Sequence, residues 1–456
     1  MYLGTMKKTI IHTITPQSLR CVDHRNYPTP ERMETPLLNG WVASPNARGT
    51  IDIIWSCVVT VFLCSWSVLF LNVPDKHSFR SYLSTKLSWV AFTIFFPEIL
   101  ASFAQVQYLS ARHSVAAFHE LGYSDWSMTH AFFADMGGFM LDSPDYPRFP
   151  VNAHQVRYLV EHGFVEYPSI HRDTIQDKNK ADAFVRILTS IQILWFALQC
   201  IGRAVQQLHV SMLELDVVAI VVCTIPTFYF WFHKPLDVDT TVTLYMEGSL
   251  QLSDVLALAD PDIAKRPWKL TPLDFINPHP DPFQILDPIM WAFEYLLRIG
   301  TDSKHVPITR FKGTARMNPG KVTVTEWMIS TTAALTFILI HFISWNFHFP
   351  TSLEQTLSRA ACLTLLGVGF SFGNLWILMI WQLPNLCRWT GIPQVDTVTE
   401  YLPHIHPFFQ YLLTVTHIGA YGIARTFIIV EGCAGLRELP ESSFLSVEWS
   451  DLLPHI

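Results

Sequence analysis

One carboxylate in this sequence lies inside an apolar run that is long enough to cross a membrane. Glu98 directly follows Pro97 near the middle of the run 87–108. A charged group at that depth is costly and normally faces protein or water with a partner. The proline also deprives the preceding turn of a hydrogen-bond donor. These features predict an acid/base group or a cation ligand at Glu98, and a protonated acid that bridges two helices is the alternative.

Three further apolar runs carry polar residues at helical spacing. The run 183–204 and its end carry Thr189, Gln192, Gln199, Arg203 and Gln206; the run 408–430 carries Gln410, Thr414, His417, Tyr421 and Arg425; the run 51–73 carries Cys57, Thr60, Cys64 and Ser67. Helices that turn polar faces toward one another can line a common cavity. The alternative is interhelical hydrogen bonding, worth about 1 kcal/mol or less per contact. Two arginines and a histidine among these residues favour the cavity.

The string "HFISWNFHFPTSLEQTLSR" (341–359) joins two other apolar runs. Pro350 ends the first helix, and Thr351 or Ser352 with Glu354 is typical of a helix N-terminal cap. Capping does not explain His341, Asn346 or Arg359, which we therefore assign to the cavity.

These residues together predict a site for acid/base chemistry. Glu98 is the expected acid or base, and His341 or His417 is the expected second proton carrier. Arg203 and Arg425 are expected to hold an anionic or carbonyl group. The remaining residues expected to bind substrate are Gln199, Asn346 and Arg359.

The stretch "THAFFADMGGFML" (129–141) is apolar but too short to span, and Asp135 interrupts it. A helix lying in the membrane interface would place Phe132, Phe133, Met136, Phe139 and Met140 on one face and His130, Ala134, Asp135 and Gly138 on the other. His130 and Asp135 lie about 140° apart on such a helix, so they cannot form an adjacent pair. The spacing also departs from the HxxxD string of membrane acyltransferases. Lys234, Asp237, His404 and His406 are expected on the same membrane side, and "HIHP" (404–407) alone is weak evidence for a metal.

The composition predicts an all-α membrane protein. Only 15% of the 456 residues are charged and half are hydrophobic, whereas soluble chains carry about a quarter charged residues. Seven apolar runs could span as helices: 51–73, 87–108, 183–204, 213–232, 326–345, 360–381 and 408–430. We therefore expect a bundle of about seven transmembrane helices with one interfacial helix and two long loops.

This organisation divides the chain into five parts. They are an N-terminal segment 1–50, a membrane region 51–232 with four spans and the loop 109–182, a polar loop 233–325, a membrane region 326–430 with three spans, and a tail 431–456. Lysine and arginine counts place the N-terminus and the loop 233–325 in the cytosol. An odd number of spans then places Trp449 on the opposite side.

Several classes of function lack their sequence signals. No phosphate-binding loop, dinucleotide fingerprint, haem cysteine signature or serine hydrolase elbow occurs, so no cofactor is expected. The net charge of −7 is spread along the chain without a basic patch, and a nucleic-acid partner is therefore not expected.

Six strings occur in order: "CSWSVLFLNVP" (64–74), "FPEIL" (96–100), "MTHAFFADMGGF" (128–139), "WFHKPLDV" (231–238), "WNFHFPTSLEQTLSR" (345–359) and "VEWSDLLPHI" (447–456). Together they resemble a large family of fungal multi-pass integral membrane proteins that is mostly uncharacterised. Members of that family are sometimes encoded beside genes for lipophilic secondary metabolites. The resemblance implies a supporting or tailoring role in such biosynthesis and implies no catalytic residue.

The leading hypothesis is an endomembrane protein, most simply of the endoplasmic reticulum, that acts on a lipophilic small molecule by cofactor-free proton transfer. Its expected partners are that molecule, membrane lipids and other biosynthetic enzymes. A transporter or seven-span receptor would use the same cavity without chemistry. The third hypothesis is a membrane scaffold whose long loops recruit soluble enzymes.

Overall fold

The computed structural model describes residues 36–44, 48–70, 72, 79–170, 175, 180–235, 240–259, 271–276, 308, 311, 324–391 and 405–449. Contacts divide the chain into two units, Met1–Pro36 and Leu37–Ile456. Everything below concerns the second unit. Asp237 and His404 lie outside the described residues.

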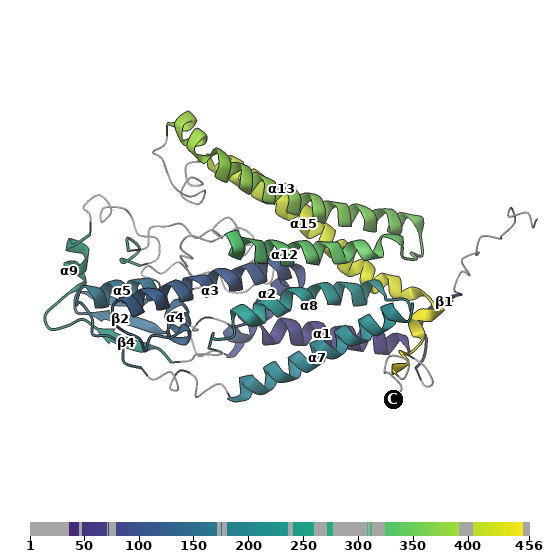
Figure 1. Ribbon diagram of the computed structural model, residues 1–456, viewed down its shortest axis with the longest axis horizontal. Helices are drawn as coiled ribbons and strands as arrows, with labels where there is room; N and C mark the ends of the chain where they lie inside the picture. Colours follow the sequence, from purple (N-terminus) through teal and green to yellow (C-terminus); the bar gives the residue numbers. More distant parts are fainter. Residues whose placement is uncertain are drawn as a thin grey trace, which may run out of the picture. The chain divides into compact units, whose positions relative to one another are not determined.

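Long helices dominate the described chain (Figure 1). They are α1 (Thr50–Ser67), α2 (Phe79–Phe95), α3 (Pro97–Glu120), α7 (Lys180–Val205), α8 (Met212–Phe230), α12 (Val324–Phe342), α13 (Ser352–Thr390) and α15 (Pro407–Ala434). A short 3₁₀ turn, η2 (Ile343–Asn346), follows α12. Each of the seven apolar runs thus contains helix. The most extensive helix contacts join α13 with α15, α12 with α8, and α3 with α8.

Local chemistry fixes several helix ends. Ser211 begins α8 by accepting from the backbone N–H of Glu214, whose carboxylate accepts in return from the backbone N–H of Ser211. Thr351 begins α13 by accepting from the backbone N–H of Glu354 at 3.2 Å. The cap predicted from the sequence is thereby confirmed.

Three helices are long and apolar enough to cross a membrane: Thr50–Ser67, Phe184–Val205 and Met212–Phe230. The run 87–108 is not one straight helix, because α2 and α3 meet at Phe96 with a bend of 112°. If this bent pair is a single broken span, the described residues contain four. The described residues therefore do not show the seven spans that the sequence predicts.

Two short strands correct the predicted topology. β1 (Leu37–Asn39) pairs antiparallel with β5 (Glu438–Pro440), Leu37 opposite Pro440. The 3₁₀ turns η4 (Gly435–Arg437) and η5 (Glu441–Phe444) flank β5. Hydrogen-bonded strands cannot lie on opposite faces of a bilayer. The two ends of the described chain therefore lie together, whereas the sequence placed the N-terminus and Trp449 on opposite membrane sides.

The fold is also not all-α, because the segment predicted as a loop with an interfacial helix forms a small α/β layer (Figure 1). It contains α4 (Met128–Asp135), β2 (Phe139–Ser143), β3 (Tyr146–Val151) and α5 (Ala153–Glu161), joined by β4 (Val242–Tyr245) and α9 (Leu252–Ala257) from after α8. The strand order is β3-β2-β4, with β2 antiparallel to β3 and parallel to β4.

Two glycines explain why the interfacial helix 129–141 does not form. Gly137 adopts φ +84°, and its N–H and that of Gly138 bond back to the carbonyls of Ala134 and Phe133 at 2.9 and 2.8 Å. This pair of bonds is the Schellman termination that a left-handed glycine permits. A Cβ on Gly138 would meet the ring of Phe133 at 2.5 Å. The chain therefore leaves the helix, and the expected division into two faces is wrong because every residue of α4 after Met128 is buried.

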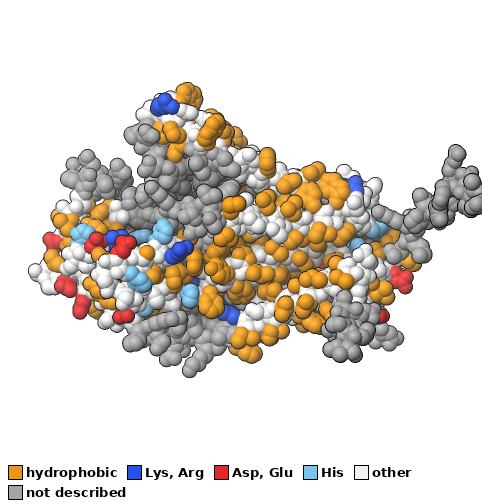
Figure 2. Space-filling model, viewed as in Figure 1, with side chains coloured by type: hydrophobic (Ala, Val, Ile, Leu, Met, Phe, Trp, Pro, Cys, Tyr) orange, Lys and Arg blue, Asp and Glu red, His pale blue; other side chains and the backbone are white. Residues whose placement is uncertain are grey.

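The surface separates into apolar and charged regions (Figure 2). Apolar side chains cover the visible face of the long helices, whereas acidic and basic side chains gather over the α/β layer. Of the three candidate spans, α7 is the most exposed, with Phe184 68% and Ile191 60% exposed. Within its apolar stretch only 17% of residues are buried. Exposure of this kind is typical of a surface that contacts lipid.

Candidate functional site

The break between α2 and α3 leaves backbone carbonyls at the end of α2 that need hydrogen-bond donors. Pro97 occupies the first position of α3 and has no N–H to offer. The bend of 112° also takes the carbonyls of Ile94 and Phe95 away from the N–H groups that a continuous helix would supply. Such carbonyls must find donors from other elements.

Arg425 on α15 supplies these donors. Its Nη2 donates to the carbonyl of Ile94 at 2.9 Å and its Nε to that of Phe95 at 3.3 Å. The side chain is fully buried, with its guanidinium carbon 4.9 Å from the ring centre of Phe337. A planar, permanently charged group with several donors suits this position better than a lysine would. Arg425 thus caps the C-terminal end of α2.

Asp216 on α8 neutralises the buried guanidinium. Its Oδ1 lies 2.6 Å from Arg425 Nη1 and 3.2 Å from His341 Nε2 on α12. His341 Nδ1 lies 2.8 Å from the carbonyl of Phe337. Its Nε2 also lies 3.1 Å from Arg425 Nη1. Both ring nitrogens of His341 therefore have partners within this group of residues.

Glu98 lies in the first turn of α3, beside this network. Its carboxylate interacts with the Tyr421 hydroxyl and with the charges of Arg425 and His341. The hydroxyl of Tyr421 also donates to the carbonyl of Phe95 at 3.4 Å. One carboxylate oxygen of Glu98, Oε2, is buried without a hydrogen-bond partner. Unpaired buried oxygens are expensive, so Glu98 is the member of the cluster with unused bonding capacity.

Three of the residues predicted for one site therefore come together, namely Glu98, His341 and Arg425. Arg203 does not join them. Its guanidinium donates to the carbonyls of His209, Leu445, Ser442 and Ser443 at 2.8 to 3.1 Å. Arg203 thus fastens the C-terminal segment to the end of α7. Gln199, also on α7, is partly buried two turns before the helix end.

The remaining predicted residues also lie outside the cluster. His417 contacts Ser371 Oγ on α13 at 3.1 Å. Arg359 donates to the carbonyl of Trp345 at 3.0 Å, and Asn346 is exposed. The polar stripe of α1 meets that of α7, where Gln192 donates to Thr60 at 3.0 Å. At this contact the stripes of α1 and α7 bond one helix to the other.

His130 and Asp135 are structural parts of the α/β layer. His130 accepts at Nδ1 from the backbone N–H of Ser127 at 3.2 Å, and its Nε2 lies 2.9 Å from the carbonyl of Ile170. Asp135 accepts from Ser110 and from the backbone N–H of Ala153 at the start of α5. Burial raises the pKa of Asp135 to about 6.

A second buried group lies just beyond α8. Lys234 is 3% exposed, and its Nζ donates to Gln107 Oε1 on α3 at 2.8 Å. Trp231 Nε1 donates to the same oxygen at 2.9 Å. Burial lowers the pKa of Lys234 to about 7, although the charge of Asp135 acts in the opposite direction. These residues border a small cavity of ≈ 20 Å³, which has room for about one water molecule.

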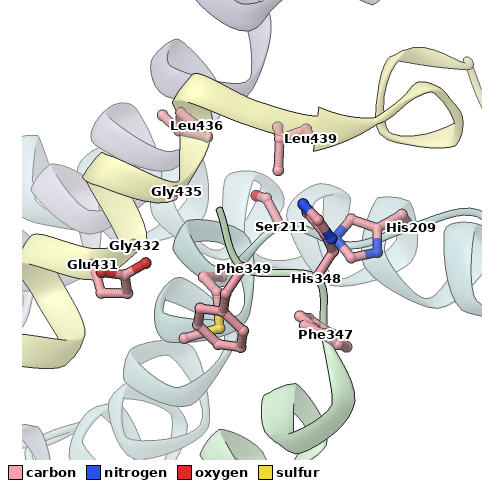
Figure 3. A pocket seen from close by; sticks show the side chains of 11 residues that line it. His209, Ser211, Phe347, His348, Phe349, Glu431, Gly432, Gly435, Leu436 and Leu439 are labelled. Atoms are coloured by element: carbon pink, nitrogen blue, oxygen red, sulfur yellow. The ribbon is translucent and has the colours of Figure 1, made fainter. Parts of the chain in front are cut away.

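Another small cavity, of ≈ 10 Å³, lies where the strand β5 approaches α8. Figure 3 shows His209 and His348 together on one side of it and Glu431 on the other. Burial lowers the pKa of His209 to about 4, and Oε1 of Glu431 is buried without a hydrogen-bond partner. Neither cavity is lined by Glu98 or Arg425.

Asp216 and Gln107 were missed by sequence reasoning. The rule that drew attention to Glu98, an ionisable residue inside an apolar run, applies equally to Asp216 in the run 213–232. Gln107 had no comparable signal, because it lies at the end of the apolar run 87–108, where an amide is ordinary. Gln107 matters because the turn after α8 brings Trp231 and Lys234 to its side-chain oxygen.

Comparison with known proteins places the chain in a family. Residues 28–260 and 300–456 match the family of unknown function DUF8562, and the chain belongs to this family. No curated protein and no solved structure matches it.

Proposed function

We propose that this protein is an integral membrane protein that acts on a lipophilic small molecule by proton transfer at Glu98. The observation that carries the proposal is the unpaired, buried carboxylate oxygen of Glu98 beside a phenol, an imidazole and a guanidinium. Ionisable residues inside apolar helix bundles are functional by default. A role in the biosynthesis of a lipophilic metabolite, in the endomembrane system, is the biological setting that we infer.

The membrane part of the proposal rests on the exposed apolar surface and the helix arrangement. Helices α1, α7, α8, α12, α13 and α15 each cross once, and the bent pair α2 and α3 enters and returns. Six crossings are an even number, in accord with the pairing of β1 with β5 at one end of the bundle. Phe96 and Pro97 then form the tip of a re-entrant element, and backbone that is not helical is tolerated there because protein surrounds it.

The chemistry divides between Glu98 and Tyr421. Glu98 exchanges a proton with the substrate through Oε2, which no protein group occupies. Tyr421, whose hydroxyl faces the same carboxylate, is the second proton carrier in place of His341. Such transfers support isomerisation, cyclisation or group transfer without a cofactor and contribute about 10²–10⁴-fold to a rate.

Arg425 and His341 are positioning residues in this scheme. The guanidinium is engaged by two carbonyls, Asp216 and His341, so it holds the helix break in place and fixes the direction of Glu98. This full engagement also favours a second candidate, a binder or transporter that uses Glu98 as a hydrogen-bonding partner without chemistry.

Profiling of lipophilic extracts from producing cells with and without the protein tests the proposal. Accumulation of a defined precursor and loss of its product support an enzyme. Unchanged chemistry with product retained inside the cells supports transport and contradicts catalysis. Unchanged levels and unchanged distribution of every compound would contradict both functions.

A further inference from the structure

The carboxylate of Glu431, in the last turn of α15, is buried without an ion-pair partner. The residue is 4% exposed, and its Oε1 has no hydrogen-bond partner among the described residues. The charges of Glu354 and Arg437 both act on it. Arg437, however, donates to Glu354 Oε1 and to the carbonyl of Ala434. Because an isolated buried charge is costly, buried carboxylates are normally paired or coordinate a metal ion.

The other ionisable groups around this end of the bundle have partners elsewhere or carry no charge. His348 Nε2 lies 3.0 Å from Glu438 Oε1, and Glu214 at the start of α8 pairs with Arg48. Burial lowers the pKa of His209 to about 4, so its imidazole is neutral at neutral pH. Within the described part of the chain, no positively charged side chain therefore bonds Oε1 of Glu431.

The space beside Oε1 has room for one small ion. Glu431 and Gly435 both line the cavity of ≈ 10 Å³ near β5, and a Cβ on Gly435 would stand 3.9 Å from Oε1. Figure 3 shows the segment that carries Leu436 and Leu439 passing over this space. The volume corresponds to about one water-sized sphere. An organic ligand is therefore excluded, whereas a bare ion the size of a water molecule fits.

The available ligands suit a hard cation with a single charge. The last backbone carbonyls of α15 lie at the negative end of its dipole, beside the carboxylate. Carboxylate and carbonyl oxygens favour hard cations. In the described ranges no three His, Cys, Asp or Glu side chains are grouped to hold a metal ion, as sites for zinc or calcium usually require. One carboxylate with neutral oxygens balances one positive charge.

We propose that this cavity is a binding site for a monovalent cation, sodium or potassium, with Glu431 Oε1 as its anionic ligand. The ion neutralises the buried carboxylate and joins the end of α15 to the C-terminal segment above it. The site shares no residue with the cluster around Glu98, so the ion stabilises the fold and takes no part in proton transfer there.

The test measures thermal unfolding of the full-length protein in detergent at pH 7.5, with choline chloride replacing sodium or potassium chloride at constant ionic strength. The unfolding temperature should rise by at least about 2 °C at 100 mM of the bound ion, and the rise should saturate with concentration. The titration that saturates at lower concentration identifies the preferred ion. Equal temperatures in all three salts would overturn the proposal and indicate a protonated or hydrated carboxyl. A rise with calcium chloride alone would also overturn it.

Two variants locate the ion, and a third is the matched control. Glu431→Gln keeps the shape but removes the charge, and Gly435→Val fills the cavity without changing any charge, at a residue whose φ of −63° suits any side chain. Both should abolish the difference between sodium or potassium and choline. Glu98→Gln removes the other carboxylate with an unpaired buried oxygen and should retain the difference. A response that survives in Glu431→Gln or Gly435→Val, or that disappears in Glu98→Gln, would overturn the proposed site.

Discussion

Arg425 Nη1 and Asp216 Oδ1 lie 2.6 Å apart in the interior of the bundle, and the same guanidinium satisfies the carbonyls of Ile94 and Phe95 at the broken end of α2. The ion pair and the helix break therefore depend on each other. The helix break before Pro97 leaves the carbonyls of Ile94 and Phe95 without helical donors, Arg425 donates to them, and Asp216 neutralises the charge of Arg425. Glu98, one residue beyond the proline, is held at the same junction.

Removal of either charge should destabilise the bundle. Loss of one partner from a buried pair costs about 3–5 kcal/mol, and we expect this for Asp216→Asn and Arg425→Gln. The double variant Asp216→Leu/Arg425→Leu should stay unstable, because it leaves the carbonyls of Ile94 and Phe95 without donors. Thermal unfolding of the purified protein in detergent measures both effects. A double variant as stable as the wild type would show that the carbonyls need no cap.

The pairing of β1 with β5 predicts that both ends of the described chain lie on one membrane side. Trp41→Cys and Leu445→Cys, at exposed positions, should react with an impermeant maleimide added to the same side of sealed microsomes. Glu120→Cys, at the end of α3, should react only from the other side. Labelling of Trp41→Cys and Leu445→Cys from opposite sides would contradict the even number of crossings.

Gly138 should tolerate no side chain. A Cβ would lie 2.5 Å from the ring of Phe133, which is itself a core residue, so Gly138→Ala should cost about 1–3 kcal/mol by overpacking. Gly373 in α13 is the matched control, because a Cβ there meets nothing within 4 Å. Gly373→Ala should be neutral or stabilising, since alanine favours helix by about 1 kcal/mol over glycine. Equal unfolding temperatures for the two variants would contradict the close approach at Gly138.

The pKa shifts of Lys234 and Asp135 predict opposite slopes of stability against pH. The pKa of Lys234 is lowered from 10.5 to about 7, so between these values the unfolded chain binds more protons and stability rises with pH. The pKa of Asp135 is raised from 3.8 to about 6, so its contribution falls as pH rises from about 4 to 6.

Lys234→Met tests the slope predicted for Lys234. The measurement is the difference in unfolding temperature between this variant and the wild type as a function of pH. The advantage of the methionine variant should be largest at pH 7 and shrink toward pH 10.5. A difference that is constant over this range would show that the amine is not buried in its neutral form. Asp135→Asn provides the corresponding test between pH 4 and 6.

The sequence predicts where most of the helices lie, but it does not predict where they break. Hydrophobic periodicity locates α1, α7 and α8 to within a few residues. The same signal runs through Pro97 without interruption, because a proline in an apolar run is compatible with a kinked span. The bend of 112° lies where Arg425, which is distant in sequence, bonds the carbonyls at the end of α2. Likewise, β2 pairs with β4 across a hundred residues, beyond the reach of any local pattern.

The sequence predicts which ionisable residues of the candidate site are buried, but it does not predict which partners they contact. Glu98, His341 and Arg425 attract attention as ionisable residues in apolar runs, and they do meet. Arg203 has the same signal, yet it bonds the carbonyls of the C-terminal segment. A polar stripe at helical spacing looks identical whether it lines a cavity or bonds a neighbouring helix. Only the position of the neighbour distinguishes Gln192 from Tyr421.

Substitution of Glu98 by glutamine tests the central claim most directly. Glu98→Gln keeps the size and the hydrogen-bonding capacity of the side chain but removes the exchangeable proton. Glu431→Gln is the matched control, because Glu431 also has a buried oxygen without a partner. With both proteins accumulating normally, Glu98→Gln should lower formation of the dependent metabolite on the order of a hundredfold, and Glu431→Gln should leave it unchanged. Normal metabolite from normally accumulating Glu98→Gln protein would contradict proton transfer at Glu98.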